Sequence, residues 1–175
     1  MSFARVRALV VVGVLILAAV IFVVVAIVRD SQAEPNAKPG CPAGWPVANI
    51  ALPEPKEVKV KVFNGSTKPG AEFQVTEDFK NREFRTEKPN KSGKAVNGVA
   101  ILRYGPKAVG GAHLLRGYFL DAAEIQYDPK RASDAVDVII GKDFAQLATT
   151  TEVKQSLATL GRPELPKGAC AAEES

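Results

Sequence analysis

The stretch "VKVKVFNGSTKPG", residues 58–70, decides the fold, because it joins a strand-like segment to a glycine-rich loop ahead of a helix. Valines alternate with lysines over residues 58–62, which predicts a strand with one buried face. The apolar positions that follow recur every four residues and predict one stripe of a helix: Ala71, Val75 and Phe79. Ser66 or Thr67 is expected to cap this helix at its N-terminus.

The loop of this stretch shares its glycine spacing with a phosphate-binding P-loop. Gly65 and Gly70 have four residues between them, but the motif also needs a Lys and then a Ser or Thr directly after the second glycine. Ala71 and Glu72 stand at those two positions, and a carboxylate there repels a polyphosphate. We therefore predict that the loop holds no nucleotide, and we predict no cofactor for the chain.

An internal repeat explains the glycines instead. Forty positions further on, the strand "GVAILRYGP", the helix "KAVGGAHLLRGYFLDA" and the strand "AEIQYD" repeat the scheme. The matched positions are Val62 with Leu102, Gly65 with Gly105, Gly70 with Gly110, Val75 with Leu115 and Phe79 with Phe119. Glycine permits both a tight exit from a strand and a close approach of helix to sheet, so we expect structural loops. A candidate anion site at the helix starts stays open as the alternative, formed by Asn64, Gly65, Ser66, Gly70, Gly105 and Gly110.

The rest of the globular region supplies one more strand and a last helix. "AVDVIIGKDF", residues 135–144, is a buried type of strand. Thr149 with Glu152 three residues later forms a capping-box signature, and Gly161 marks the end of the helix. We predict an α/β fold with a duplicated βαβ-type domain at residues 56–145, a mixed sheet, and a C-terminal helix and tail at residues 146–175.

The N-terminus carries an unbroken apolar run at residues 8–28, long enough for a transmembrane helix, which needs about 20 residues. The alternative is a signal peptide cleaved near Ala33, although the apolar region of such peptides is typically about 7–15 residues long. We expect a single-pass cell-membrane anchor, with residues 1–7 in the cytoplasm. Residues 29–55 are rich in proline and predict an extracytoplasmic linker.

Two cysteines decide the orientation, since the Lys and Arg residues that flank the run are balanced. Cys41 and Cys170 both follow the run and bracket the globular region, which indicates a disulfide formed outside the reducing cytoplasm. Two unrelated free thiols are the alternative. No metal site is predicted, because two Cys and the single His113 do not make a four-ligand zinc set.

Catalytic and nucleic-acid-binding signals are weak. His113 lies within a helical segment, and the sequence places no nucleophile or paired carboxylates near it, so no catalytic residue is predicted. The region after residue 30 has nearly balanced charge, which argues against a nucleic-acid partner. One local run is basic and is a candidate docking patch for anionic lipids or envelope polymers: Lys80, Arg82, Arg85, Lys88, Lys91 and Lys94. A solvated connection is the alternative for this run.

The order and spacing of these motifs resemble the LytR C-terminal domain family. The family pattern V-V-N-G-[ST] falls on Val60, Val62, Asn64, Gly65 and Ser66, and its closing V-I-G-x-D falls on Val138, Ile140, Gly141 and Asp143. The chain departs from the pattern at Ala71-Glu72, where the family often has Leu-Ala, and at Glu83, where it often has Gly.

In this family the domain follows the catalytic domain of LytR-CpsA-Psr cell-wall glycopolymer transferases, and that catalytic domain is missing from this sequence. The resemblance therefore implies a non-enzymatic, membrane-anchored extracytoplasmic module that supports cell-envelope integrity. Its expected partners are the membrane, LytR-CpsA-Psr-type or other envelope proteins, and anionic envelope polymers or lipids. A binding protein or enzyme acting on a phosphorylated lipid or sugar precursor of the cell wall is the alternative.

Overall fold

The structure is a computed structural model that describes residues 12, 13, 15–21, 41, 42 and 44–171. The chain divides into two compact units, residues 1–42 and residues 43–175, and each is considered by itself. In the first unit, residues 12, 13 and 15–21 are helical and solvent-exposed. Among the described residues, no helix combines the length and apolarity needed to cross a membrane. Most of the predicted anchor at residues 8–28, and the alternative cleavage site at Ala33, lie outside the described residues.

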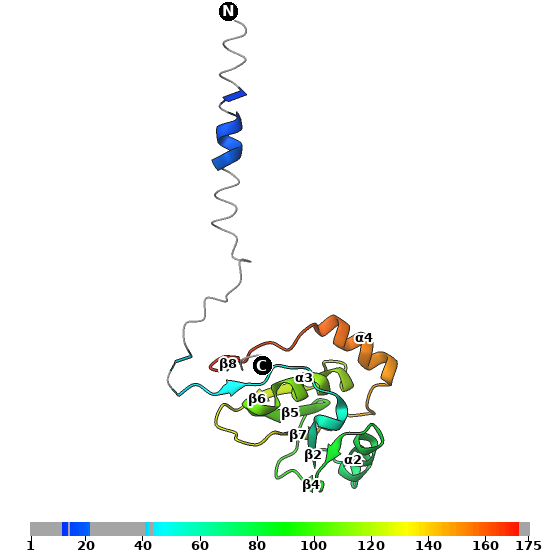
Figure 1. The fold of residues 1–175 in the computed structure, drawn as a ribbon. Coiled ribbons are helices and arrows are strands. Elements are labelled where there is room, and N and C mark those ends of the chain that lie inside the picture. The colour runs from blue at the N-terminus through cyan, green and yellow to red at the C-terminus, as the bar shows by residue number, and fades with distance from the viewer. Residues whose placement is uncertain (1–11, 14, 22–40, 43, 172–175) are drawn as a thin grey trace, which may run out of the picture. The chain divides into compact units, whose positions relative to one another are not determined.

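The second unit is built on a mixed six-stranded sheet (Figure 1). Its strands are β2 (Lys59–Asn64), β3 (Arg85–Thr86), β4 (Asn90–Lys91), β5 (Ala100–Tyr104), β6 (Glu124–Tyr127) and β7 (Ala135–Ile140). They lie in the order β3-β2-β7-β5-β6, and β4 pairs with β2 further along the edge taken by β3. All neighbours are parallel except β5 and β7, which run antiparallel. The sheet is therefore mixed, as the sequence predicts.

Helices cover one face of this sheet. α2 (Ala71–Asn81) packs on β2, α3 (Val109–Tyr118) packs on β5, and α4 (Thr150–Leu160) packs on α3. Short 3₁₀ turns precede β2 and α3, at η1 (Pro55–Glu57) and η2 (Pro106–Ala108). A separate two-stranded ribbon pairs β1 (Val47–Ala48) with β8 (Cys170–Ala171), so the two ends of the unit meet.

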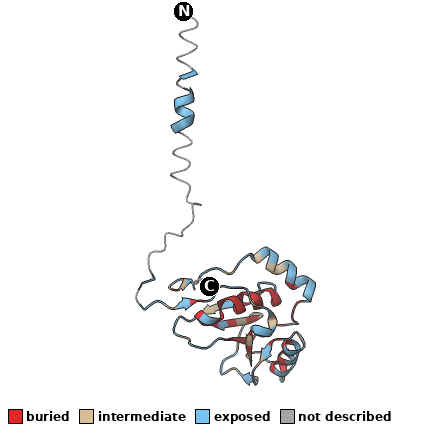
Figure 2. Cartoon of the chain, viewed as in Figure 1, coloured by how far each residue is buried: buried red, intermediate tan, exposed pale blue. Residues whose placement is uncertain are grey.

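The core lies between the sheet and α2 and α3, where Figure 2 shows the buried residues concentrated. Its largest fully buried side chains are Val60, Val62, Phe79, Leu102, Leu115, Val136, Val138 and Ile140. Edge-to-face ring pairs add directional contacts, with Phe84 at 5.2 Å from Phe79 and 5.1 Å from Tyr118 between ring centroids. The alternating valines and the stripe on the first helix are thus buried, as predicted.

Two βαβ arrangements stand on either side of β7. β2, α2 and β3 form one and β5, α3 and β6 form the other, with parallel outer strands in each. The strands predicted around residues 58–62, 98–106, 123–128 and 135–144 and the helix predicted after Thr149 are all present. The sheet also contains β4, which lies within the basic run at residues 80–94.

The predicted cap of the first helix is wrong. α2 begins after Gly70, which is its N-cap with a φ of 79° and makes no side-chain cap hydrogen bond. Ser66 is instead held inside the loop, because its hydroxyl donates to Asn64 Oδ1 at 2.8 Å and accepts from the Lys68 N–H at 3.1 Å. Because the Ser66 hydroxyl is bonded within the loop, it does not cap the helix. The helix therefore starts later than the sequence pattern suggests.

Candidate functional site

The Asn-Gly-Ser loop after β2 is closed by one side chain. The Asn64 amide nitrogen donates to Glu72 Oε2 at 2.6 Å and to the Lys68 carbonyl at 2.8 Å. Its amide oxygen accepts from the Ser66 N–H at 2.9 Å. Glu72 is almost fully buried, so this hydrogen bond satisfies a polar group that water does not reach. The residues of the family pattern therefore organise the turn between β2 and α2.

Of the four glycines in the internal repeat, the two at the strand exits have similar surroundings and the two at the helix starts do not. A Cβ on Gly65 would lie 3.0 Å from the Ile140 carbonyl oxygen, and one on Gly105 would lie 2.3 Å from the Arg131 carbonyl oxygen, so the backbone approaches closely at both strand exits. Gly70 needs its left-handed φ and has open space around it, whereas Gly110 lies inside α3 against the Ala51 carbonyl. The candidate anion site at these helix starts stays a prediction.

The six cations of the candidate docking patch have different surroundings. Lys80 pairs with Glu77 at 3.6 Å. Arg82 donates to the Ala148 carbonyl, and its guanidinium lies 5.4 Å from the centre of the Tyr118 ring, so it serves the fold. The other four are exposed, on β3, on β4 and in the segments that follow these strands: Arg85, Lys88, Lys91 and Lys94. Binding by this patch stays a prediction that rests on these four.

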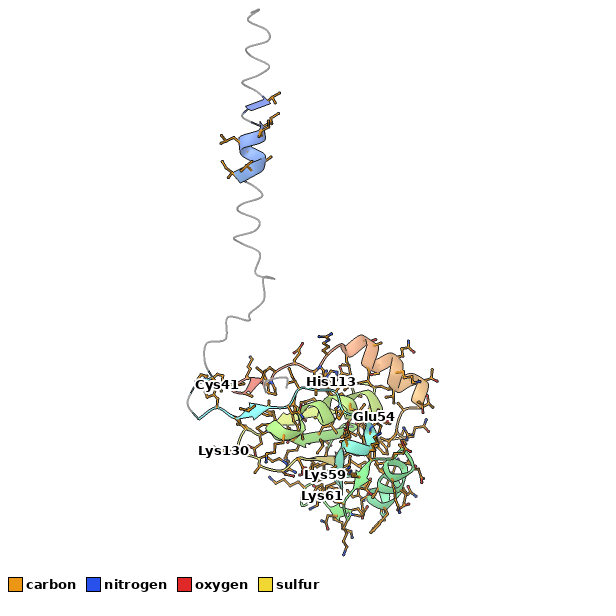
Figure 3. All side chains as sticks on the ribbon, viewed as in Figure 1. Cys41, Glu54, Lys59, Lys61, His113 and Lys130 are labelled. Carbon is orange, nitrogen blue, oxygen red and sulfur yellow. The ribbon has the colours of Figure 1, made fainter. Side chains whose placement is uncertain are left out.

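The sheet face opposite the helices carries a groove of about 550 Å³. Lys59 and Lys61, labelled in Figure 3, lie on this face, because they alternate along β2 with the buried Val60 and Val62 of the core face. Beside them an apolar row crosses three neighbouring strands, since Phe63 is in register with Ile139 and Ile139 with Ile101. Ile139 is buried, whereas the other two side chains of the row are half-buried. The segment Lys91–Val96 lines the groove as well.

A polar row runs alongside the apolar one. Asp137 lies opposite both Lys61 and Arg103 in the register of the sheet. Its carboxylate accepts two hydrogen bonds from the Arg131 guanidinium, at 2.7 and 2.9 Å, in a bidentate pair that neutralises it. Arg103 reaches Gln126 Oε1 at 3.3 Å and stays exposed. The groove therefore combines an apolar floor with an unneutralised guanidinium.

His113 is buried rather than at the surface. Its Nε2 donates to the Gly161 carbonyl at 3.0 Å, and this bond ties α3 to the end of α4. Burial lowers the pKa of His113 below its ordinary value, so the ring is neutral at physiological pH. Among the described residues, no group of three or more His, Cys, Asp and Glu side chains could hold a metal ion.

Cys41 and Cys170 are both disulfide-bonded. They are the only cysteines of the chain, so the bond joins them to each other. The predicted disulfide is thus present. Cys170 begins β8, whose partner β1 belongs to the linker, and this ribbon secures the C-terminus of the domain.

The family model described as "LytR cell envelope-related transcriptional attenuator" matches residues 57–144, which is half of the chain. The chain belongs to this family. The match confirms the resemblance seen in the sequence, and it spans all six strands of the large sheet together with α2 and α3. A search of curated proteins found no match.

One solved structure has a similar fold. It is the soluble domain of a conserved hypothetical secreted protein from Mycobacterium marinum, with a TM-score of 0.51 and 22% sequence identity. The similarity covers 69% of this chain and 82% of that chain. At this identity the likeness establishes the fold and leaves the function to the residues of the site.

The groove is the feature that the sequence does not predict. Its apolar row comes from three strands that are far apart in the chain, so no local motif contains it. The sequence offers one signal on β2. Phe63 follows Lys59 and Lys61 at the same spacing of two, so it places a large apolar side chain on the face away from the core.

Proposed function

We propose that this protein is a non-enzymatic module of the cell envelope, which acts outside the cytoplasm by binding other envelope components. Membership of a family described as cell envelope-related is the observation that carries the proposal. The disulfide supports it, because such bonds persist in oxidising compartments and are rare in the cytosol. We further propose that the apolar run at residues 8–28 anchors the protein in the membrane.

The geometry supports binding rather than catalysis. The only histidine donates its Nε2 hydrogen to a backbone carbonyl and is buried between two helices, so it is poorly placed as a general base. By contrast, no helix among the described residues covers the other face of the sheet, which presents apolar and cationic side chains together. A surface of this composition is suited to recognition, because interface cores are enriched in aromatic side chains and Arg.

Deletion of the gene in the source bacterium tests this function. We expect the deletion strain to become more sensitive to agents that attack the envelope, such as detergent and lysozyme, and the full-length gene to restore resistance. A version that ends after the linker, at residue 55, should be exported and fail to restore it. Normal resistance of the deletion strain to a panel of such agents would contradict the proposal.

A further inference from the structure

We propose that the groove on the helix-free sheet face, lined by Phe63, Ile101, Ile139, Arg103, Lys91 and Lys94, binds an acidic segment of a partner protein that carries apolar side chains between its carboxylates. The inference deepens the proposed function by naming a surface and the chemistry of its partner. It rests on that function for its cellular setting only.

The charge of the groove calls for an anion. Lys91, Lys94 and Arg103 are exposed around it, and within the described part of the chain none of them forms an ion pair. Asp137 also lines the groove, but its bidentate pair with Arg131 cancels its charge. Arg103 keeps donors available beyond its bond to Gln126 and can receive a carboxylate in a forked geometry.

The floor of the groove calls for an apolar group beside that anion. Phe63, Ile139 and Ile101 stand side by side on neighbouring strands, which are about 4.8 Å apart, so the row is about 10 Å across. Removing apolar surface of this kind from water favours association. A partner that presents only charge would leave this contribution unused.

The same composition argues against a glycan or a lipid. Sugar hydroxyls laid on an apolar floor would lose their hydrogen bonds to water, and a buried polar group without a partner destabilises the complex. Of the uncharged polar side chains in the lining, Gln126 is already bonded to Arg103 and to Glu124, and Ser92 to its own turn. A lipid chain needs a pocket that buries most of its surface, whereas this groove is partly open to solvent.

A protein segment meets all of these conditions. Two adjacent apolar side chains cover the row of three, and flanking carboxylates reach Arg103 on the sheet and Lys91 or Lys94 on the lining segment. The partner's backbone polar groups stay at the open side, where water satisfies them. Attraction of this kind is screened by salt and shared between the cations.

Defined peptides test the proposal with the full-length protein in detergent. The probe is a labelled hexapeptide, Ac-DDLFDD-NH₂, and fluorescence anisotropy measures its dissociation constant. We expect saturable binding that weakens about tenfold when Asn replaces every Asp, and about tenfold when Ser replaces Leu and Phe. Equal binding of all three peptides, or none by the first, would overturn the inference.

Charge reversals locate the binding. Arg103→Glu, and separately Lys91→Glu with Lys94→Glu, should each weaken binding of the acidic peptide at least fivefold, with unchanged thermal melting because the three side chains are exposed. The matched controls are Lys154→Glu on α4, and Lys154→Glu with Lys167→Glu, which reverse exposed cations outside the groove. Loss of binding in the controls as large as in the groove variants would place the peptide elsewhere and overturn the inference.

Vesicles of phosphatidylglycerol form the last arm. Binding of the protein to these vesicles that Arg103→Glu abolishes, together with no binding of the acidic peptide, would assign the groove to lipid and contradict a protein partner. Complementation of the deletion strain separates this inference from the proposed function. If deletion weakens the envelope and the groove variants restore its resistance fully, the proposed function stands but the groove has no part in it.

Discussion

Glu83 holds a backbone conformation that most side chains avoid. Its φ is 69°, and it follows the last turn of α2, where the Phe84 N–H returns to the Phe79 carbonyl at 3.1 Å. This is the helix ending that glycine usually makes, since a left-handed conformation costs other residues about 1–2 kcal/mol. The geometry explains why the family pattern favours Gly at this position, and it identifies Glu83 as a point of local strain.

We predict that Glu83→Gly stabilises the protein by about 0.5–1 kcal/mol, because relief of the left-handed strain exceeds the added freedom of the unfolded chain. Urea denaturation gives the free energy of unfolding. The control is Glu77→Gly in the interior of α2, which should lower it by about 1 kcal/mol. Equal destabilisation by both changes would refute the strain at Glu83.

Asn64 provides a second test at the residue scale, through the sign of a pH effect. Asn64→Asp would place a carboxylate against Glu72, whose Oε2 now accepts the Asn64 amide at 2.6 Å. Two facing carboxylates raise the pKa of at least one of them, so the folded state holds its proton to higher pH than the unfolded state. The penalty is therefore present at neutral pH and is relieved as the pH falls through the raised value.

We expect Asn64→Asp to lose about 1–3 kcal/mol of unfolding free energy at pH 7 and to recover part of that loss at pH 5. The control, Asn90→Asp, lies exposed on β4 and should stay within about 0.5 kcal/mol of the parent at both values. Denaturation curves for the parent and the two variants at both pH values measure these unfolding free energies. A loss that is the same at pH 5 and pH 7 contradicts the carboxylate contact.

Among the elements, α4 depends on its first residue. The Thr149 side chain accepts from the Glu152 N–H at 3.4 Å, and the Glu152 carboxylate accepts from the Thr149 N–H at 2.7 Å, which completes a capping box. We predict that Thr149→Ala lowers the unfolding free energy by about 1 kcal/mol. Thr151→Ala, two residues further along and exposed in the first turn, should be neutral or slightly stabilising. Equal effects in chemical denaturation would show that the cap does not hold the helix.

His113 lies at the contact between α3 and α4, and its protonation makes the stability of the fold depend on pH. Because burial lowers the pKa of this ring in the folded state, the unfolded chain binds the proton more readily. Stability should therefore be complete above the unfolded pKa of about 6.5 and fall as the pH decreases below it. We expect His113→Gln to flatten the dependence between pH 7 and pH 5.5 in thermal melting. An unchanged dependence in this variant would place its origin in other groups.

At the same scale, local patterns predict the elements far better than the surface they build. Valines spaced by two predict β2, and apolar residues spaced by four predict α2. These predictions succeed because the buried face of each element is formed by residues close together in the sequence. The first residue of α2 is not predicted by such patterns, because the Ser66 hydroxyl donates to Asn64 within the turn and does not cap the helix. The groove escapes it completely, because the alignment of Phe63, Ile139 and Ile101 follows from strand order and register.

For the whole molecule, the disulfide links the linker to the C-terminus. We predict that exported protein, analysed without reductant by intact-mass spectrometry, is lighter than its reduced form by two hydrogens. Replacing both Cys41 and Cys170 by Ser should lower the free energy of unfolding by about 5 kcal/mol in the chain-entropy model, because the bond closes a loop of about 130 residues. Two freely alkylated thiols in exported protein would contradict the disulfide.

For the whole protein, we propose that it serves the envelope by binding through the groove on the sheet face opposite the helices. The most direct measurement is complementation of the deletion strain with Arg103→Glu combined with Lys91→Glu, at wild-type protein level, against the control Lys154→Glu combined with Lys167→Glu. Survival in detergent is the readout. The control should restore survival, whereas the groove variant should leave survival at the level of the deletion strain. Full restoration by the groove variant would contradict this proposal.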